Sequence, residues 1–304
     1  MNRKKYGFVF CLLVVIAMIS LGTVSIYVNH EEKKEATEQL RVVTSFYPMY
    51  VAAMNVTDSC ESVTLENLSE PQTGCLHDYQ LTPEDMVLLS KADVFIINGG
   101  GIENFLSEVA SRYPNLTIIE AGEGIEMSGE NAHLWMDTEK YQKQVQNIAK
   151  GLSEVDETNK KIYQKNADAY CEQIVDLTEE YRDTCNGNGQ KVVLFHEGLE
   201  YAANEWNMND VYTLNLDEER QVSAGEVADV LSAIQKDGAK MILAERTYGE
   251  ELAESVKKET NVPVVYLDTC VRGKYEKDAY LKAMRSNFCL LYTSPSPRDR
   301  SVSR

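Results

Sequence analysis

One uninterrupted helical stretch in the middle of the chain constrains the fold most. Residues 157–185 contain neither glycine nor proline, and the residues NGNG at 186–189 end the stretch abruptly. At about 1.5 Å per residue such a helix is roughly 45 Å long, more than one small domain needs. A coiled coil is the competing interpretation, but no clean heptad persists. We therefore predict one long helix, at 154–188, that joins two lobes.

Short apolar runs alternate with helical segments on both sides of this helix. The predicted strands lie at 42–45, 62–68, 92–98 and 116–119 before it, and at 191–195, 211–214, 241–244 and 262–267 after it. Strands that alternate with helices form parallel sheets. The sequence therefore predicts an α/β fold with an N-terminal lobe at 41–153 and a C-terminal lobe at 189–288, each a parallel sheet flanked by helices.

The N-terminus has the features of an export segment. Basic residues at 3–5 precede an apolar run at 6–28, which is typical of a signal and also long enough to span a bilayer. A buried core helix is the alternative. Because positive charge stays on the cytoplasmic side, we expect the rest of the chain outside the cytoplasm, with the first 28 residues as a signal or membrane anchor and 29–40 as a tether. Cys11 lies in the middle of the run, so we do not predict lipidation there.

Composition excludes two classes of function. The formal net charge of −18 argues against nucleic-acid binding, which needs clustered Lys and Arg. The seven cysteines include no C-x-x-C spacing, which argues against a zinc ribbon or a thioredoxin-type site. The tail at 289–304 resembles the translation of a sequencing-adapter sequence, so we expect it to be non-native and predict no fold or function for it. A natural Ser/Pro-rich tail is the alternative.

Three of the four histidines lie at or just past the ends of predicted strands, and so does one aspartate. Neutral imidazoles suit Zn²⁺ and Mn²⁺, and a carboxylate adds charge compensation. We therefore predict that His77, His133, His196 and Asp268 hold one metal ion in the cleft between the lobes, two ligands coming from each lobe. The alternative for each histidine, considered by itself, is a structural role instead of metal ligation. His30 lies in the tether and is expected to have no role.

At these residues the chain resembles the zinc/manganese-binding solute-binding proteins of bacterial ABC importers. The resemblance covers roughly 41–288, and the matching segments are VTSFYP at 43–48, GCLHDYQLTPED at 74–85, AHLWMD at 132–137, FHEGLEY at 195–201, YLD at 266–268 and YLKAMRSN at 280–287. It implies two α/β lobes joined by one long helix. It also implies that the same three histidines and Asp268 take the four ligand positions.

The resemblance implies a monomeric binding protein, not an enzyme, that captures Zn²⁺ or Mn²⁺ and delivers it to the permease and ATPase of an ABC importer. Some members that prefer manganese have Glu at the third ligand position. His196 stands there in this chain and favours zinc, while the adjacent Glu197 keeps manganese open. An extracytoplasmic zinc metallohydrolase is the alternative, although catalytic zinc keeps an open water position and no H-E-x-x-H is present. Surface adhesion with an incidental metal is a third possibility.

Two cysteines and one glutamate near the predicted ligands have open roles. Cys75 and Cys270 each lie two residues from a predicted ligand. Outside the cytoplasm Cys60 and Cys75 could form a disulfide that braces the loop of the first ligand. Metal ligation by the Cys75 thiolate is the weaker alternative. Glu245 ends a strand near the cleft, either as a hydrogen-bond partner of a ligand or as a solvated strand end.

Overall fold

The computed structural model describes residues 39–182, 187–216 and 221–293. The predicted signal or anchor, almost all of the tether and the end of the tail lie outside these ranges. No helix among the described residues is long and apolar enough to cross a membrane.

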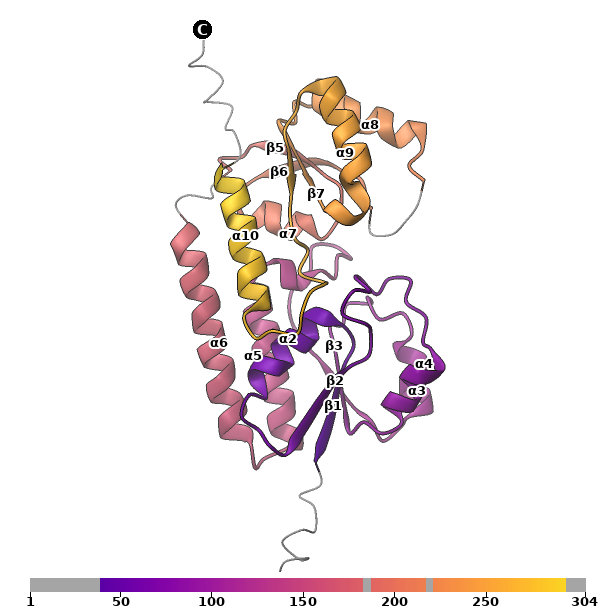
Figure 1. Cartoon of the computed structure of the whole chain (residues 1–304), viewed down its shortest axis with the longest axis vertical. Helices are drawn as coiled ribbons and strands as arrows, with labels where there is room; N and C mark the ends of the chain where they lie inside the picture. Colours follow the sequence, from indigo (N-terminus) through magenta and orange to yellow (C-terminus); the bar gives the residue numbers. More distant parts are fainter. Residues whose placement is uncertain (1–38, 183–186, 217–220, 294–304) are drawn as a thin grey trace, which may run out of the picture. The chain divides into compact units, whose positions relative to one another are not determined.

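The N-terminal lobe is built on a four-stranded sheet with the strand order β2-β1-β3-β4, of which Figure 1 labels β1, β2 and β3. Strand β3 pairs in parallel with β1 and with β4. All four residues of β3 are buried, as expected for a central strand that is covered on both faces. The elements of this lobe are β1 (Leu40–Thr44), α2 (Tyr47–Val56), β2 (Val63–Asn67), α3 (Pro83–Leu89), β3 (Val94–Ile97), α4 (Leu106–Arg112) and β4 (Thr117–Glu120).

The C-terminal lobe repeats this arrangement with the order β6-β5-β7-β8. Its strand pairs are parallel, and Val193, Phe195 and Ile242 lie in its hydrophobic core. The predicted fold class, two parallel-sheet lobes flanked by helices, is therefore confirmed. The elements are β5 (Lys191–Leu194), α7 (Leu199–Glu205), β6 (Asn209–Thr213), α8 (Ala224–Gln235), β7 (Met241–Ala244), α9 (Arg246–Thr260) and β8 (Val264–Tyr266).

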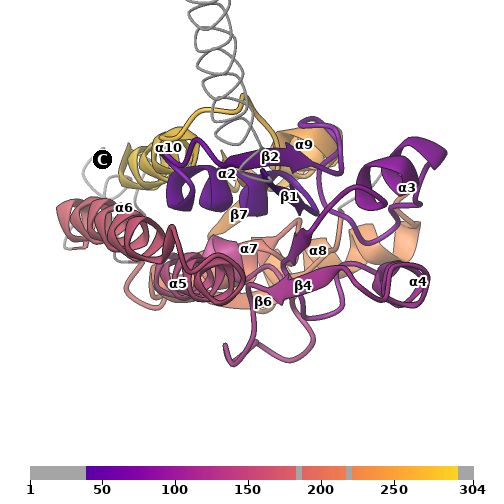
Figure 2. The same cartoon turned by 90° about the horizontal axis from the view of Figure 1, so that it is seen from below.

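Two long helices separate the two sheets along the chain. A short 3₁₀ turn, η1 (Leu134–Met136), leads into α5 (Thr138–Val155), and α6 (Lys160–Tyr181) follows. Helix α6 packs along α5 and also contacts α2 and α10 (Figure 2). It starts later than predicted, because the Asp156 carboxylate accepts hydrogen bonds from the Asn159 backbone and side chain and forms a turn that separates it from α5.

The last described helix, α10 (Ala279–Thr293), extends into the predicted tail. The expectation that 289–304 has no fold was wrong for 289–293. The buried residues of α10 recur at helical spacing through position 291: Tyr280, Met284, Phe288 and Leu291. The first proline of the tail comes only at position 295, so nothing in the sequence stops the helix earlier. The non-native origin of the tail remains a prediction.

Candidate metal site

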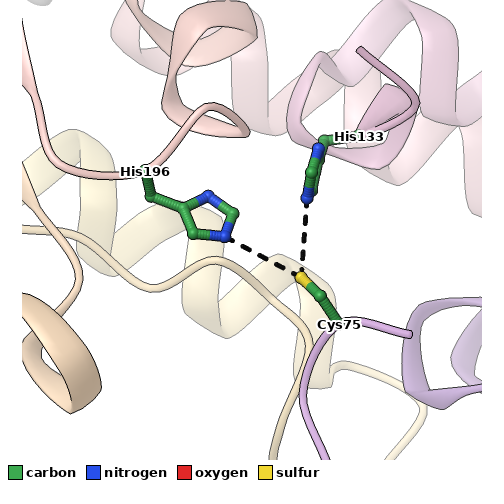
Figure 3. Close-up of side chains that lie close together, drawn as sticks. All are labelled: Cys75, His133 and His196. Carbon is green, nitrogen blue, oxygen red and sulfur yellow. Dashed lines mark hydrogen bonds between the residues drawn. The ribbon is translucent and has the colours of Figure 1, made fainter. Parts of the chain in front are cut away.

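Three histidines and one cysteine meet at loops that follow strands of both lobes. Cys75 and His77 lie in the loop between β2 and α3, His133 directly precedes η1, and His196 is the second residue after β5. The Cys75 Sγ lies 3.5 Å from the Nε2 of His133 and 3.9 Å from the Nε2 of His196 (Figure 3). The Nε2 atoms of His77 and His133 lie 3.4 Å apart. The structure therefore brings all three predicted histidine ligands together at the carboxyl ends of the sheets.

Two of the three imidazoles are fully buried. His133 and His196 have no exposed surface, whereas the His77 side chain is 29% exposed. The His133 ring packs against the rings of His196 and Trp135, with centroids 5.0 Å away in each case. Burial, and to a smaller extent the neighbouring His196 and His77, lowers the pKa of His133 well below its usual value. His133 is therefore neutral, the form that binds metal ions.

Asn131 sets the orientation of the His133 ring. Its side-chain oxygen lies 2.9 Å from the Nδ1 of His133 and accepts the ring N–H, while its amide nitrogen donates to Glu197 O and to the Glu200 carboxylate. These contacts fix the amide, so the proton of His133 is on Nδ1. The lone pair of Nε2 then faces His77 and Cys75, as a metal ligand requires.

His196 is held by the turn that follows it. The backbone N–H of Gly198 donates to the Nδ1 of His196 at 3.0 Å, and the Nε2 faces Cys75. A metal ion at Nε2 would shift the ring proton to Nδ1. Metal binding at Nε2 would therefore remove this hydrogen bond.

Glu197 lies at the edge of the cluster. Its Oε1 lies 3.5 Å from the Nε2 of His77 and 3.6 Å from the Nδ1 of His133. These three residues form a second group of potential ligands beside the group Cys75, His133 and His196. The carboxylate thus lies on the side of His133 that Asn131 already occupies.

Asp268, the fourth predicted ligand, belongs to neither group of potential ligands among the described residues. Its Oδ1 accepts the backbone N–H of Cys270 at 2.8 Å, and its own N–H donates to Asn287 at 2.8 Å. It lines a pocket of about 340 Å³ together with residues of α2 and α10, including Tyr47 and Tyr280. Burial raises the pKa of the Asp268 carboxyl. Its role as a ligand remains a prediction.

The expected Cys60–Cys75 disulfide is wrong, because both residues are thiols in the structure. Cys60 is buried in the turn after α2, whereas Cys75 points at two histidines. The signal for this contact was present in the sequence. Cys75 and His77 lie two residues apart in the same loop and both reach His133, while Leu76 between them is fully buried.

Glu245 is neither a partner of a predicted ligand nor a solvated strand end. It is buried, and its carboxylate pairs with Arg272 at 2.5 Å and accepts the Thr269 hydroxyl at 3.1 Å. The same guanidinium donates to Gln72 O at 3.1 Å and to the Tyr248 hydroxyl at 2.8 Å. Arg272 therefore ties the C-terminal lobe to the loop that carries Cys75.

Known proteins resemble this chain over most of its length. The family model of the zinc-uptake complex component A, periplasmic (ZnuA), matches residues 42–294. The manganese-binding lipoprotein MntA of Halalkalibacterium halodurans is 25% identical over 297 residues, which cover 93% of this chain and 96% of MntA. The high-affinity zinc uptake system protein ZnuA of Bacillus subtilis is 25% identical over 283 residues, covering 84% of this chain and 88% of the relative.

A solved structure shows the same fold. The solute-binding protein FpvC of Pseudomonas aeruginosa, in complex with Mn²⁺, superimposes with a TM-score of 0.76 and 21% sequence identity, covering 84% of this chain and 97% of FpvC. The family model spans most of the chain and includes every residue of the cluster. The chain belongs to the family of the periplasmic zinc-uptake complex component A.

Proposed function

We propose that this protein captures a divalent metal ion outside the cytoplasm, with Zn²⁺ as the preferred cargo, and delivers it to the permease and ATPase of an ABC importer. The observation that carries the proposal is the convergence of three imidazoles from two lobes, with His77 and His133 only 3.4 Å apart. Imidazole nitrogens are ordinary ligands of Zn²⁺, and one ion can be bound by several of them at once. The zinc and manganese relatives support the transport role.

The nitrogen-rich set of donors supports zinc over manganese. Imidazole suits Zn²⁺, whereas Mn²⁺ prefers carboxylate, carbonyl and water oxygens. His77, His133 and His196 supply three nitrogens, and the fourth position is assigned by the resemblance to Asp268. Glu197, 3.5 Å from His77, is the carboxylate that keeps Mn²⁺ as a second possible cargo.

Capture rather than catalysis is the role that we infer. Members of this family are binding components of transport systems, and complete burial of His133 and His196 leaves little room for a substrate beside the ion. A hydrolase would need a metal-bound water and a base, for which Glu197 is the nearest carboxylate. A Glu197→Gln variant that keeps metal uptake in cells supports transport.

We place the protein outside the cytoplasm and at the membrane. The basic start and apolar run at 1–28 support export, and the manganese-binding relative is named as a lipoprotein. Fractionation of cells and mass spectrometry of the mature N-terminus test this placement. A cleaved, lipidated N-terminus would replace the hydrophobic segment as the anchor.

Metal content and competitive titration test the function. The purified full chain is compared with His196→Ala and with the matched control His30→Ala, which removes a histidine of the tether. We expect one tightly held zinc per chain in the wild type and in the control, and loss of that zinc in His196→Ala. A folded wild-type chain without stoichiometric metal would refute the proposal, and manganese held in preference to zinc would change the cargo.

A further inference from the structure

We propose that Cys75 is a ligand of the bound metal ion and adds one thiolate sulfur to the histidine nitrogens that hold it. The inference rests on the proposed function of metal capture and specifies its chemistry. The cargo would be a thiophilic ion such as Zn²⁺.

The spacing of the ligand atoms matches a tetrahedral centre. With Zn–N about 2.0–2.1 Å and Zn–S about 2.3 Å, two nitrogens on a tetrahedral zinc lie about 3.4 Å apart, and a nitrogen and a sulfur about 3.6 Å apart. The observed distances are 3.4 Å for His77–His133, 3.5 Å for Cys75–His133 and 3.9 Å for Cys75–His196. The ligand atoms of Cys75, His133 and His196 all lie within 4.8 Å of one another. One ion fits among these three atoms, and His77, 3.4 Å from His133, belongs to the other group.

The loop directs the Cys75 side chain into the cluster. Leu76 is completely buried and anchors the loop, and the side chains of its neighbours Cys75 and His77 both reach His133. A Cβ on Gly74 would lie 2.3 Å from the guanidinium of Arg272, which packs directly on the loop. Arg272 also donates a hydrogen bond to Gln72 O. Its contacts with Gln72 and Gly74 together hold the loop in place.

The two carboxylates near the site are less suited to the fourth position in this arrangement. The oxygen of Glu197 lies 3.6 Å from the Nδ1 of His133, whereas the ion must contact Nε2, because Asn131 holds the Nδ1 proton. One ion cannot contact both nitrogens of one ring. Asp268 is in neither group of potential ligands, and its Oδ1 is held by the backbone of Cys270.

A thiolate changes both charge and selectivity. Imidazole ligands carry no charge and leave the dipositive charge of the ion uncompensated, whereas the thiolate of Cys75 neutralises half of it. Thiolate sulfur favours Zn²⁺ and similar ions, whereas Mn²⁺ favours oxygen. We therefore expect a larger preference for zinc over manganese than a set of three histidines and Asp268 would give.

Cobalt substitution of the full chain tests the ligand. Sulfur bonded to Co²⁺ produces an intense charge-transfer band in the near ultraviolet, which nitrogen and oxygen ligands do not give. We expect this band in the wild type and in the controls Cys60→Ser and Cys270→Ser, and its loss in Cys75→Ser. Zinc affinity should fall by more than about tenfold in Cys75→Ser. Losing a residue that only orients a ligand already costs about 10- to 100-fold, and losing a ligand should cost more.

Two outcomes separate this inference from the proposed function. Stoichiometric cobalt without the band, or a band that persists in Cys75→Ser, would overturn Cys75 as a ligand and leave metal capture intact. Absence of stoichiometric cobalt and zinc would overturn both. Cadmium NMR of the wild type gives a measurement that needs no variant: a resonance shifted downfield by sulfur supports the inference, and one typical of nitrogen and oxygen ligands alone contradicts it.

Discussion

The amide oxygen of Asn131 accepts the Nδ1–H of His133 at 2.9 Å, and this contact fixes which nitrogen of the ring can bind a metal ion. The amide nitrogen of Asn131 donates to Glu197 O at 2.9 Å, in the loop that follows β5. The C-terminal lobe therefore sets the tautomer of a ligand that the N-terminal lobe carries. The two lobes are coupled at the site before any metal arrives.

Replacing Asn131 with alanine should weaken zinc binding by about 10- to 100-fold, the usual effect of losing a residue that orients a metal ligand. Without the amide, the His133 proton is no longer confined to Nδ1. Competitive titration with a chelator measures the change. The matched control is Asn147→Ala, because Asn147 also bonds two backbone carbonyls of the same lobe, at Ala121 and Glu123, but lies outside the cluster. Equal affinities of the two variants would contradict this role of Asn131.

Gly198 is the position at which a single methyl group should disturb two ligands at once. A Cβ there would lie 2.9 Å from the Cδ2 of His133 and 2.9 Å from the Nδ1 of His196. Both rings are buried and cannot move freely, so Gly198→Ala should lower zinc affinity by at least about tenfold and destabilise the fold by about 1–3 kcal/mol.

Gly225→Ala is the control for that substitution. Its Cβ would meet only the Ser223 hydroxyl oxygen, at 3.7 Å, in the first turn of α8. This change should leave zinc affinity unchanged and slightly stabilise the helix. Zinc titration and urea unfolding of both variants give the comparison. Unchanged zinc affinity in Gly198→Ala would show that the turn has room to move.

The sheets could be predicted because central parallel strands are nearly continuous apolar runs. Val94–Ile97 and Met241–Ala244 are buried at every position, and such runs stand out between helical segments. The start of α6 could not be predicted as well. The turn at Asp156 contains no glycine or proline and depends on an Asn159 side chain that bonds back to the aspartate.

The location of the site could be predicted from the sequence, but its set of ligands could not. The three histidines His77, His133 and His196 were predicted to reach the same cleft because they follow predicted strands, and ligand sites of open α/β sheets lie beyond the carboxyl ends of the strands. A position after a strand does not show which neighbouring side chain points at the ion. Asp268 also follows a strand, yet it lies outside both groups of potential ligands, whereas Cys75, two residues from His77, lies inside one. That difference depends on the loop conformation.

Removing one partner of the buried ion pair between Arg272 and Glu245 should be strongly destabilising. The side chains are 18% and 9% exposed, and Arg272→Met would leave the glutamate charge buried without its partner. Such a loss is expected to cost about 3–5 kcal/mol. Adding Glu245→Gln should recover much of it, because the unpaired charge is then removed. Urea unfolding of the single and double variants measures the coupling.

The control for this pair is Arg285→Met. Arg285 pairs with Glu180 at 2.7 Å, but both side chains are about half exposed. An exposed pair of this kind contributes about 0–1 kcal/mol. A loss in Arg272→Met no larger than in Arg285→Met would show that Glu245 finds water or another partner.

Glu205 should make the metal-free protein less stable as the pH rises. It connects α7 to the start of α5, because its carboxylate accepts the Thr138 hydroxyl and, at 3.3 Å, the Thr138 backbone N–H. Burial, with a smaller contribution from Asp137, raises its pKa from 4.5 to about 7. The folded state therefore binds the Glu205 proton more tightly than the unfolded state does. The resulting stability is complete below about pH 4.5 and is lost as the pH rises through 7.

Glu205→Gln removes this dependence and supplies the comparison. The two proteins should be similarly stable at pH 5, and at pH 8 the variant should be more stable by about 1–2 kcal/mol, since one pKa unit corresponds to about 1.4 kcal/mol and residual solvent reduces the effect. Glu103, whose pKa burial also raises to about 7, affects both proteins equally and cancels. Urea unfolding at the two pH values decides the outcome. Parallel pH profiles would show that Glu205 is ionised in the folded protein across this range, with the two hydrogen bonds from Thr138 outweighing its burial.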